Sequence, residues 1–334
     1  MSELDDVVGV AVAAVQAASA VTSAAQGRLA SGSTLTKGDD SPVTVADFAA
    51  QAIVCRVLAD AFGSVAVVGE ETPDDLADRP ELLAGVTSLV RGASVPGAET
   101  LSDADVLAAI ALGGADASAG GRYWTLDPID GTKGFLRGDQ YAIALALVDD
   151  GEVVLGVLGC PNLVNPDGSR GAVLVGVDGA ATISTGRQRE GGAAWGPPVP
   201  IRVDSPEMLA QARLCESVES GHSDQGQSAE IARRLGIVSE PYRIDSQCKY
   251  AAVGRGDASI YLRLPTRADY VEKIWDHAAG KFIVECAGGV VTDVAGSPLD
   301  FGQGARLEAN RGVVATSGRF HDDVLAAVSA VIDA

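Results

Sequence analysis

The chain has 334 residues, 47% of them hydrophobic, and a formal net charge of −20 that is spread along its length. This composition is typical of a globular protein with a substantial core, and the length suits one large or two ordinary domains. An acidic balance without basic clusters argues against nucleic acid or an anionic membrane as a partner. Five cysteines without Cys-x-x-Cys spacing argue against a disulfide framework and a zinc site, so we expect buried free thiols.

The first predicted element is an alanine-rich helix over residues 4–29. Two aspartates precede its apolar part, whereas a signal peptide begins with basic residues. Polar residues interrupt the helix, and we expect that no segment has the roughly 20 predominantly apolar residues of a membrane span. These features predict a soluble, cytoplasmic protein.

A second helix is predicted over residues 48–62, and a short apolar strand then ends at Gly69-Glu70-Glu71. Asp47 stands immediately before that helix, where an aspartate commonly caps the first turn. Residues 72–121 are rich in Pro, Asp and Gly and contain one helical stretch near 103–111. We expect a surface connection there, without chemistry.

The run 123–134 carries the most chemical information, because it sets two carboxylates three residues apart at the end of an apolar strand. Pro128 favours an extended backbone at Asp127. Gly131, directly after Asp130, permits a sharp turn and a close approach to a ligand. Such paired carboxylates suit Mg²⁺, which takes its ligands from a few carboxylates and from substrate phosphates. The run predicts a metal site that faces a phosphate, and hydrolysis of a phosphate ester.

Four apolar runs of strand type follow, at residues 141–148, 153–158, 172–177 and 181–185. The turn signals Asp149-Asp150-Gly151 and Asp178-Gly179 separate them in pairs, so we expect β-hairpins in an antiparallel sheet. The composition changes near residue 200, and helices and strands alternate beyond it. We therefore predict an α+β domain over residues 1–203 and an α/β domain over 204–334.

A further acidic signature lies in residues 274–280, where Asp276 stands at the start of a predicted helix and the helix dipole favours negative charge. Alone, this aspartate would indicate only a capped helix. Asp127 and Asp130 alone would indicate a turn. The chemical interpretation depends on these residues occurring together.

Taken together, the acidic positions resemble those of the lithium-sensitive, magnesium-dependent phosphatases of the inositol monophosphatase superfamily. Within that superfamily, nearly the whole chain is most similar to the 3′(2′),5′-bisphosphate nucleotidases. The strings that carry the resemblance are Ser41-Pro42-Val43-Thr44, residues 124–134, residues 135–142, Gly159-Cys160-Pro161-Asn162 and Tyr261-Leu262-Arg263-Leu264-Pro265. The resemblance implies an α/β fold of the layered αβαβα sandwich type.

The resemblance also implies a site that binds two or three Mg²⁺ ions. The implied metal ligands are Glu70, Asp127, the carbonyl oxygen of Ile129, Asp130 and Asp276. The four carboxylates together carry −4, and like charges this close repel one another unless they are neutralised. Three Mg²⁺ ions would leave +2, which matches a phosphate dianion. One ion would lower the pKa of the attacking water, and another would stabilise the leaving 3′-oxygen.

Activation of the water would involve Glu70 through a metal and the Thr132 hydroxyl through a hydrogen bond, with Asp47 accepting from Thr132. The N–H groups of Gly131 and Thr132 would open a helix and bind phosphate oxygens. The nucleotide contacts that the resemblance implies, in addition to Asp276, are His222, Ser246, Lys249 and Arg263.

The implied reaction releases the 3′-phosphate of adenosine 3′,5′-bisphosphate to give AMP, with 3′-phosphoadenylyl sulfate, a compound of sulfur metabolism, as a second substrate. Two alternatives stay open. One is an inositol polyphosphate 1-phosphatase or another small phosphate-ester phosphatase, because the metal motifs are common to the superfamily while the nucleotide contacts are not. The other is a non-catalytic metal- or nucleotide-binding protein. We expect a lithium-sensitive monomer without nucleic acid or membrane partners.

Overall fold

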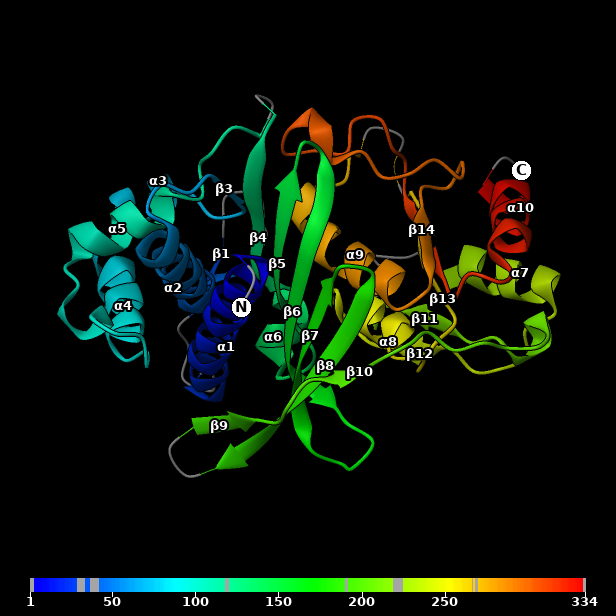
Figure 1. Cartoon of the computed structure of the whole chain (residues 1–334), viewed down its shortest axis with the longest axis horizontal. Coiled ribbons are helices and arrows are strands. Elements are labelled where there is room, and N and C mark those ends of the chain that lie inside the picture. The colour runs from blue at the N-terminus through cyan, green and yellow to red at the C-terminus, as the bar shows by residue number, and fades with distance from the viewer. Residues whose placement is uncertain are drawn as a thin grey trace.

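The computed structural model describes residues 3–28, 34–36, 42–117, 120–189, 192–218, 225–265, 267 and 270–332. Its helices and sheets form five layers in the order α, β, α, β, α (Figure 1). An outer helical layer covers an eight-stranded sheet, a pair of helices lies between this sheet and a five-stranded one, and two further helices cover the outer face. The expected layered sandwich is therefore confirmed.

The first layer contains the long N-terminal helix and four shorter helices. They are α1 (Glu3–Arg28), α2 (Val45–Phe62), α3 (Asp74–Ala77), α4 (Pro80–Arg91) and α5 (Asp103–Ala111). Small buried residues such as Ala14 of α1 and Ala50 of α2 belong to the same core cluster as Leu126 of the sheet. The small side chains allow the two helices to pack closely against each other and against the strands.

Within residues 72–121 the helical stretch expected near 103–111 is confirmed as α5, but the expectation of a surface connection is wrong elsewhere, because the segment also contains α3 and α4. In α4, Leu82, Val86 and Val90 lie four residues apart and are buried in one cluster with residues of α2. Pro80 suits the first turn of α4, because its missing N–H has no partner there in any helix. The apolar spacing was present in the sequence, but the surrounding Pro, Asp and Gly obscured it.

The large sheet has the strand order β10-β8-β7-β6-β5-β4-β3, with β9 paired to β8. Its strands are β3 (Val67–Gly69), β4 (Arg122–Asp130), β5 (Ala142–Asp149), β6 (Glu152–Val164), β7 (Arg170–Val177), β8 (Ala180–Arg189), β9 (Gly192–Trp195) and β10 (Val199–Pro200). Every pair is antiparallel except β3 with β4, which is parallel. Asp150 and Gly151 have φ of 48° and 84°, the positive values that a tight hairpin turn requires. The predicted hairpins are confirmed.

The smaller sheet is mixed and has the order β12-β11-β13-β15-β14. Its strands are β11 (Leu214–Glu216), β12 (Tyr242–Arg243), β13 (Ile260–Arg263), β14 (Val290–Thr292) and β15 (Val313–Thr316). The helices α8 (Cys248–Gly254) and α9 (Ala278–Cys286) lie between the two sheets, and α7 (Gln225–Leu235) and α10 (His321–Ile332) cover the outer face (Figure 1). A separate two-stranded sheet pairs β1 (Thr34–Thr36) with β2 (Pro42–Thr44).

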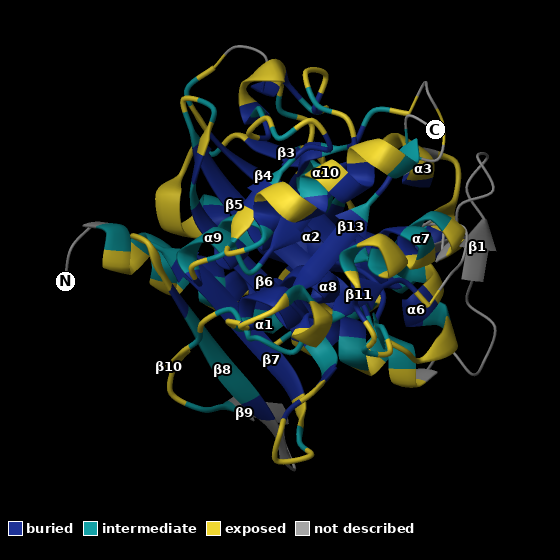
Figure 2. Ribbon diagram, turned by 90° about the vertical axis from the view of Figure 1, so that its right-hand side faces the viewer, coloured by how far each residue is buried: buried dark blue, intermediate teal, exposed yellow. Residues whose placement is uncertain are grey.

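One hydrophobic cluster extends across both sheets and the helices between them. It contains Tyr123 of β4, Leu158 of β6, Tyr250 of α8, Ile283 of α9 and Ala315 of β15. Figure 2 shows the buried residues running through the middle of the molecule, with exposed residues on the outer helices and loops. Because this core is shared, the domain boundary between residues 203 and 204 stays a prediction.

All five cysteines are free and four of them are buried, as predicted, whereas Cys286 is half-buried. The expectation that no segment is long and apolar enough to span a membrane is wrong for one helical stretch, Leu4–Gly27. Buried residues on one face of this helix, including Ala11 and Val15, pack in the cluster that contains the large sheet. A helix that packs on the core of a globular domain can have the length and apolar composition of a membrane span. The contacts of α1 with the large sheet are those of such a core helix.

Candidate active site

The paired aspartates of β4 lie at an irregularity in the strand. Asp127 pairs with Ala144 of β5 in regular register, the register then shifts, and Asp130 pairs with Ala142. A proline between the aspartates cannot donate to the ladder, and such bulges change the direction of side chains. Gly131 follows with φ 90° and ends the strand, and the short helix α6 (Thr132–Arg137) begins directly after it. The predicted strand, turn and helix start are confirmed.

Glu70 lies beside this strand end because β3 runs parallel to β4. Gly69 is in register with Leu126, and the Glu70 N–H donates to the Leu126 carbonyl oxygen at 3.2 Å. The carboxyl ends of parallel strands meet at one edge of a sheet. Glu70 therefore stands next to Asp127, although 57 residues separate them in the sequence.

A buried glutamine of α2 fixes the end of β3. Gln51 accepts a hydrogen bond from the Glu71 N–H at 3.0 Å and donates to the carbonyl oxygens of Glu71 and Ile110 at 2.6 and 3.0 Å. A Cβ atom at Gly69 would lie 2.6 Å from the Gln51 side chain, and one at Gly113 would lie 2.4 Å from it. No role was predicted for Gln51, because a glutamine within an apolar helix carries no signal of its partners.

The remaining acidic residues reach the same place from two helices. Asp276 ends the 3₁₀ turn η5 (Ile274–Asp276) just before α9, as the sequence predicted. Asp47 is buried in the first turn of α2, which begins at Val45, so it lies inside this helix and not before it. Val45 and Ala46 continue the helix backward because they carry no competing hydrogen-bonding side chain.

Burial, together with mutual repulsion, raises the pKa of both aspartates of β4. Burial, followed by the charges of Glu70, Asp130, Asp276 and Asp47, raises the pKa of Asp127 well above its ordinary value. Burial and the charge of Asp276 raise the pKa of Asp130 to about 6, against the opposing charge of Lys249. The structure therefore brings the predicted carboxylates within electrostatic reach of one another.

This acidic cluster, Asp47, Glu70, Asp127, Asp130 and Asp276, could bind a metal ion. The Oδ1 atom of Asp127 is buried and has no hydrogen-bond partner among the described residues. A buried carboxylate oxygen that lacks a partner and faces further carboxylates is costly, and a divalent cation would compensate it. The donors are all oxygen atoms, which suits Mg²⁺.

A second group of ligand-type atoms is used differently. Side-chain atoms of Glu272, Asp276 and His277 lie within 4.8 Å of one another. However, Glu272 accepts from Arg263 Nε at 3.1 Å, and His277 Nε2 lies 3.1 Å from the other Glu272 oxygen. His277 Nδ1 lies 2.8 Å from the Tyr250 hydroxyl. Both imidazole nitrogens are thus occupied, so Glu272 and His277 are engaged with Arg263 and Tyr250, while Asp276 belongs to this group and to the acidic cluster.

Three of the four predicted nucleotide contacts approach the acidic cluster from the C-terminal part of the chain. Ser246 lies in the turn before α8 with a left-handed φ of 65°. Burial lowers the pKa of Lys249, in α8, while the charge of Asp130 opposes this shift. Arg263 ends β13 and pairs with Glu272. His222 lies outside the described residues.

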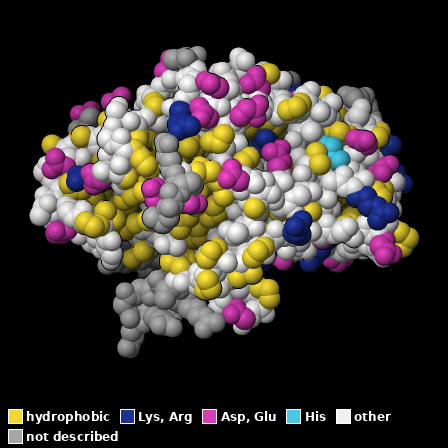
Figure 3. All heavy atoms as spheres, in the orientation of Figure 1, with side chains coloured by type: hydrophobic (Ala, Val, Ile, Leu, Met, Phe, Trp, Pro, Cys, Tyr) yellow, Lys and Arg dark blue, Asp and Glu magenta, His cyan; other side chains and the backbone are white. Residues whose placement is uncertain are grey.

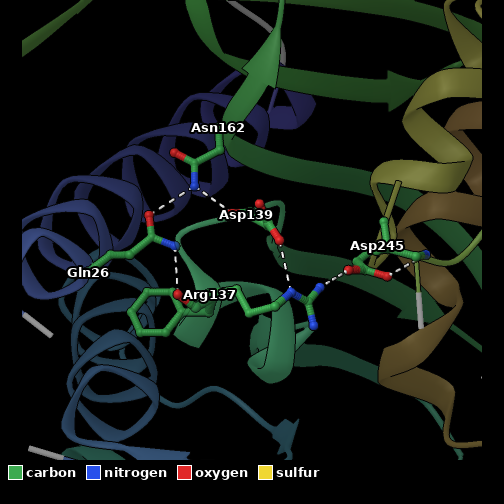
Figure 4. Close-up of polar contacts among 7 residues, drawn as sticks. Gln26, Arg137, Asp139, Asn162 and Asp245 are labelled. Carbon is green, nitrogen blue, oxygen red and sulfur yellow. Dashed lines mark hydrogen bonds and ion pairs between the residues drawn. The ribbon is translucent and has the colours of Figure 1, made fainter. Parts of the chain in front are cut away.

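A polar network, which sequence analysis did not assign, holds α6 from one side (Figure 4). The side-chain amide of Gln26, in α1, donates to the Phe135 carbonyl oxygen at 2.8 Å. The amide of Asn162 donates to Gln26 Oε1 at 2.9 Å and to the Asp139 carbonyl oxygen at 2.6 Å. The helix after the paired aspartates is thus tied to α1 and β6.

An ion pair holds α6 from the other side. Arg137, the last residue of α6, donates to the Asp245 carboxylate at 2.5 Å and to that of Asp139 at 2.8 Å. Asp245 also accepts from the Val218 N–H at 3.0 Å. Arg137 lies in the string 135–142, and Asp245 immediately precedes the predicted contact Ser246. That the two residues form an ion pair is apparent only in the folded structure.

The layered fold and the acidic cluster at the strand ends define the class of this protein. The chain belongs to the inositol monophosphatase family, whose model matches residues 3–333. Its relatives include the 3′(2′),5′-bisphosphate nucleotidase of Schizosaccharomyces pombe, which is 42% identical over 336 residues, 96% of this chain and 94% of the relative. A protein of the same name from Oryza sativa is 45% identical over 309 residues, 89% of this chain and 86% of the relative. The family predicted from the sequence is confirmed.

Solved structures agree with the fold. The IMPase of Thermotoga maritima has a TM-score of 0.64 at 21% identity and covers 100% of this chain and 99% of its own. The inositol monophosphatase of Anabaena has a TM-score of 0.61 at 21% identity, with 99% and 98% covered.

Proposed function

We propose that this protein is a Mg²⁺-dependent 3′(2′),5′-bisphosphate nucleotidase that hydrolyses the 3′-phosphate of adenosine 3′,5′-bisphosphate to give AMP and phosphate. The observation that carries the proposal is the acidic cluster around Asp127, with its buried carboxylate oxygen that has no hydrogen-bond partner among the described residues. Identities of 42% and 45% to proteins with this name, over most of the chain, support the substrate class.

Glu70, Asp127, the Ile129 carbonyl, Asp130 and Asp276 would hold two or three Mg²⁺ ions. When bound, Mg²⁺ would neutralise the carboxylates, lower the pKa of a water molecule and stabilise charge on the departing oxygen. These carboxylates stand directly after β3, in β4 and in η5. Each side chain therefore stands on an element that the core holds in place.

The chain's own residues would orient the attacking water and the phosphate. The Thr132 hydroxyl donates weakly to the Ile129 carbonyl oxygen at 3.4 Å, a distance long enough for this hydroxyl to exchange partners. Asp47 would then accept from Thr132, so that the hydroxyl oxygen and Glu70 position the water. The N–H groups of Gly131 and Thr132, at the start of α6, would bind phosphate oxygens.

The nucleotide would contact the C-terminal part of the chain. Ser246 is buried and Arg263 is half-buried at the edge of the acidic cluster. Lys249 is buried beside Asp130. We propose that Arg263 and Ser246 bind the nucleotide and that Lys249 supplies positive charge to the same ligand from its buried position. His222 would contact the adenine.

The test is phosphate release from adenosine 3′,5′-bisphosphate, measured with Mg²⁺ and with a chelator. Replacing Asp130→Asn should lower turnover by more than about 100-fold, because a ligand is lost and not only a supporting residue. Asp323→Asn, an exposed aspartate of α10, is the matched control and should retain activity. No release by well-folded wild-type protein would refute the proposal. Faster hydrolysis of inositol 1,4-bisphosphate would instead favour the inositol phosphatase alternative.

We propose further that the protein acts as a cytoplasmic monomer, without nucleic acid or membrane partners, and that millimolar lithium inhibits it. The charge of −20 supports the absence of polyanionic partners. On the face drawn in Figure 3, acidic side chains are scattered and no large basic patch is seen among the coloured residues. Light scattering tests the monomer, since one chain has a mass of 33.9 kDa.

A further inference from the structure

We propose that Gln247 is a positioning residue that holds Asp130 and Asp276 at a fixed separation, so that the acidic cluster is shaped for metal before any ion binds. The inference rests on the proposed function, because the separation matters only if these carboxylates bind a common group of ions. Gln247 stands between Ser246 and Lys249, in the string from which those two contacts were predicted, but no role was predicted for Gln247 itself.

Three hydrogen bonds of Gln247 reach the Asp130 carboxylate and the backbone before and after Asp276. Its backbone N–H donates to the Asp130 carboxylate. Its side-chain Nε2 donates to the carbonyl oxygen of Trp275, the residue before Asp276, at 2.8 Å. Its Oε1 accepts from the Gly280 N–H, in the first turn of α9, at 3.0 Å. One residue, only 2% exposed, therefore bonds to one carboxylate and to the backbone on both sides of the other.

The side-chain amide is required for this arrangement because it offers a donor and an acceptor at a fixed spacing. The Gly280 N–H has no partner within α9, since it lies among the first residues of the helix. A Cβ atom at Gly280 would lie 2.3 Å from the Tyr250 ring, so α8 and α9 are in direct contact here. This contact fixes how far Gln247 stands from Asp276.

The turn that carries Gln247 is itself anchored. Asp245 is paired with Arg137 of α6 and accepts from the Val218 N–H (Figure 4). Ser246 has a left-handed φ of 65°, which a residue with a side chain adopts only when its surroundings determine it. A Cβ atom at Gly131 would lie 2.9 Å from Ser246 Cβ. The turn therefore packs closely against Gly131, the residue after Asp130, and this contact with the end of β4 fixes the position of the turn.

These contacts link two segments that are 146 residues apart and carry charges of the same sign. Two aspartates at close range repel each other, and without a restraint η5 would shift away from the end of β4. The amide of Gln247 opposes this shift through Trp275 and Gly280. Loss of the amide should therefore weaken metal binding more than nucleotide binding, because Ser246 and Arg263 keep their positions.

The experiment compares two variants with a matched control. Gln247→Met keeps the length of the side chain and removes the amide, and Gln247→Glu keeps the acceptor for Gly280 but removes the donor to Trp275. The control is Asn165→Leu, another buried amide, which donates to Ser169 Oγ and to the Gly171 carbonyl oxygen in the β6–β7 connection. Mg²⁺ binding is measured by calorimetry without substrate, and KM for adenosine 3′,5′-bisphosphate is measured at saturating Mg²⁺.

Both Gln247 variants should bind Mg²⁺ about 10- to 100-fold more weakly, while KM changes by less than about threefold. Asn165→Leu should lower the melting temperature and leave Mg²⁺ affinity unchanged. Wild-type Mg²⁺ affinity in the Gln247 variants would overturn the inference, and Gln247→Glu alone decides if Gln247→Met does not fold. Wild-type protein that neither binds Mg²⁺ nor releases phosphate would overturn the proposed function instead, so the two failures are distinguishable.

Discussion

At the scale of single residues, Gly131 shows that a site can require a residue without a side chain. Its φ of 90° lies in the region that favours glycine, and a Cβ atom there would lie 2.9 Å from Ser246 Cβ. Both constraints act on the residue between Asp130 and Thr132. The sequence indicated the turn, whereas the close approach of Ser246, 115 residues later, appears only in the folded protein.

Gly131→Ala should therefore destabilise the fold by about 1–3 kcal/mol and also impair phosphate release, because the turn must move away from Ser246. The free energy of unfolding is measured in urea, and activity in the phosphate assay. Gly63→Ala is the matched control, since Gly63 has φ 75° but nothing within 4 Å of its Cβ position. Equal losses of stability and full activity in both variants would show that the contact with Ser246 is unimportant.

At the scale of elements, α6 is held in place by a partly buried ion pair. The side chains of Arg137 and Asp245 are 34% and 8% exposed, and their shortest distance is 2.5 Å. A comparable surface pair, Arg122 with Asp149, has a distance of 2.6 Å and exposures of 59% and 34%. The two pairs have similar distances and differ in solvation, and Arg137 and Asp245 also bond to Asp139 and Val218.

A double-mutant cycle with Arg137→Met and Asp245→Asn should give a coupling energy of about 1–3 kcal/mol. The same cycle at Arg122 and Asp149, with Met and Asn, should give below about 1 kcal/mol, because water screens an exposed pair. Urea denaturation of each variant supplies the free energies. Equal coupling in the two cycles would mean that α6 is not held by this ion pair.

The first turn of α10 contains a pH-sensitive contact. The two ring nitrogens of His321 lie 2.9 Å from the hydroxyl oxygens of Thr292, in β14, and Thr316, in β15. Burial lowers the pKa of His321 below 6.5. Between its folded and unfolded pKa values the unfolded chain binds more protons, so stability rises with pH there. The contribution of His321 is complete above about pH 6.5 and is lost as the pH falls toward the lower folded pKa.

Replacing His321→Gln should remove this dependence. The melting temperatures of wild type and variant are compared between about pH 5 and 8, where histidine is the side chain that ordinarily titrates. The melting temperature of the wild type should exceed that of the variant most near pH 8, and this difference should decrease toward pH 5. A constant difference across this range would contradict the assignment.

At the scale of the whole molecule, the acidic cluster joins the ends of β3 and β4 to α2 on one face of the large sheet and to the start of α9 on the other. An ion that binds only the folded protein adds about 2.7 kcal/mol to its stability at a concentration 100 times its dissociation constant. Mg²⁺ should therefore raise the melting temperature of the wild type, and a chelator should reverse the shift. Asp323→Asn should respond like the wild type, and Asp130→Asn should lose most of the response. Identical melting with Mg²⁺ and with chelator would argue against the metal site.

The hairpins, the first helix and the run around Asp127 were predictable because their signals are local. Turn residues such as Asp150-Gly151, alternating or continuous apolar runs, and two carboxylates within four residues all express short-range preferences. The helix α4 was missed although its apolar residues are regularly spaced, because breaker residues on both sides outweighed the pattern. Gln51, Arg137 and Gln247 were missed because a polar residue shows its partners only after the chain has folded.

By itself, the sequence determined which acidic residues were available, where the hairpins of the large sheet lie, and the family to which the chain belongs. The tertiary structure alone decided which distant groups meet: Glu70 beside Asp127 through a parallel strand pair, and Asp130 linked to the segment of Asp276 through Gln247. The physical reason is that backbone preferences act over a few residues, whereas repulsion between carboxylates and the satisfaction of buried amides depend on distances set by packing of the whole core.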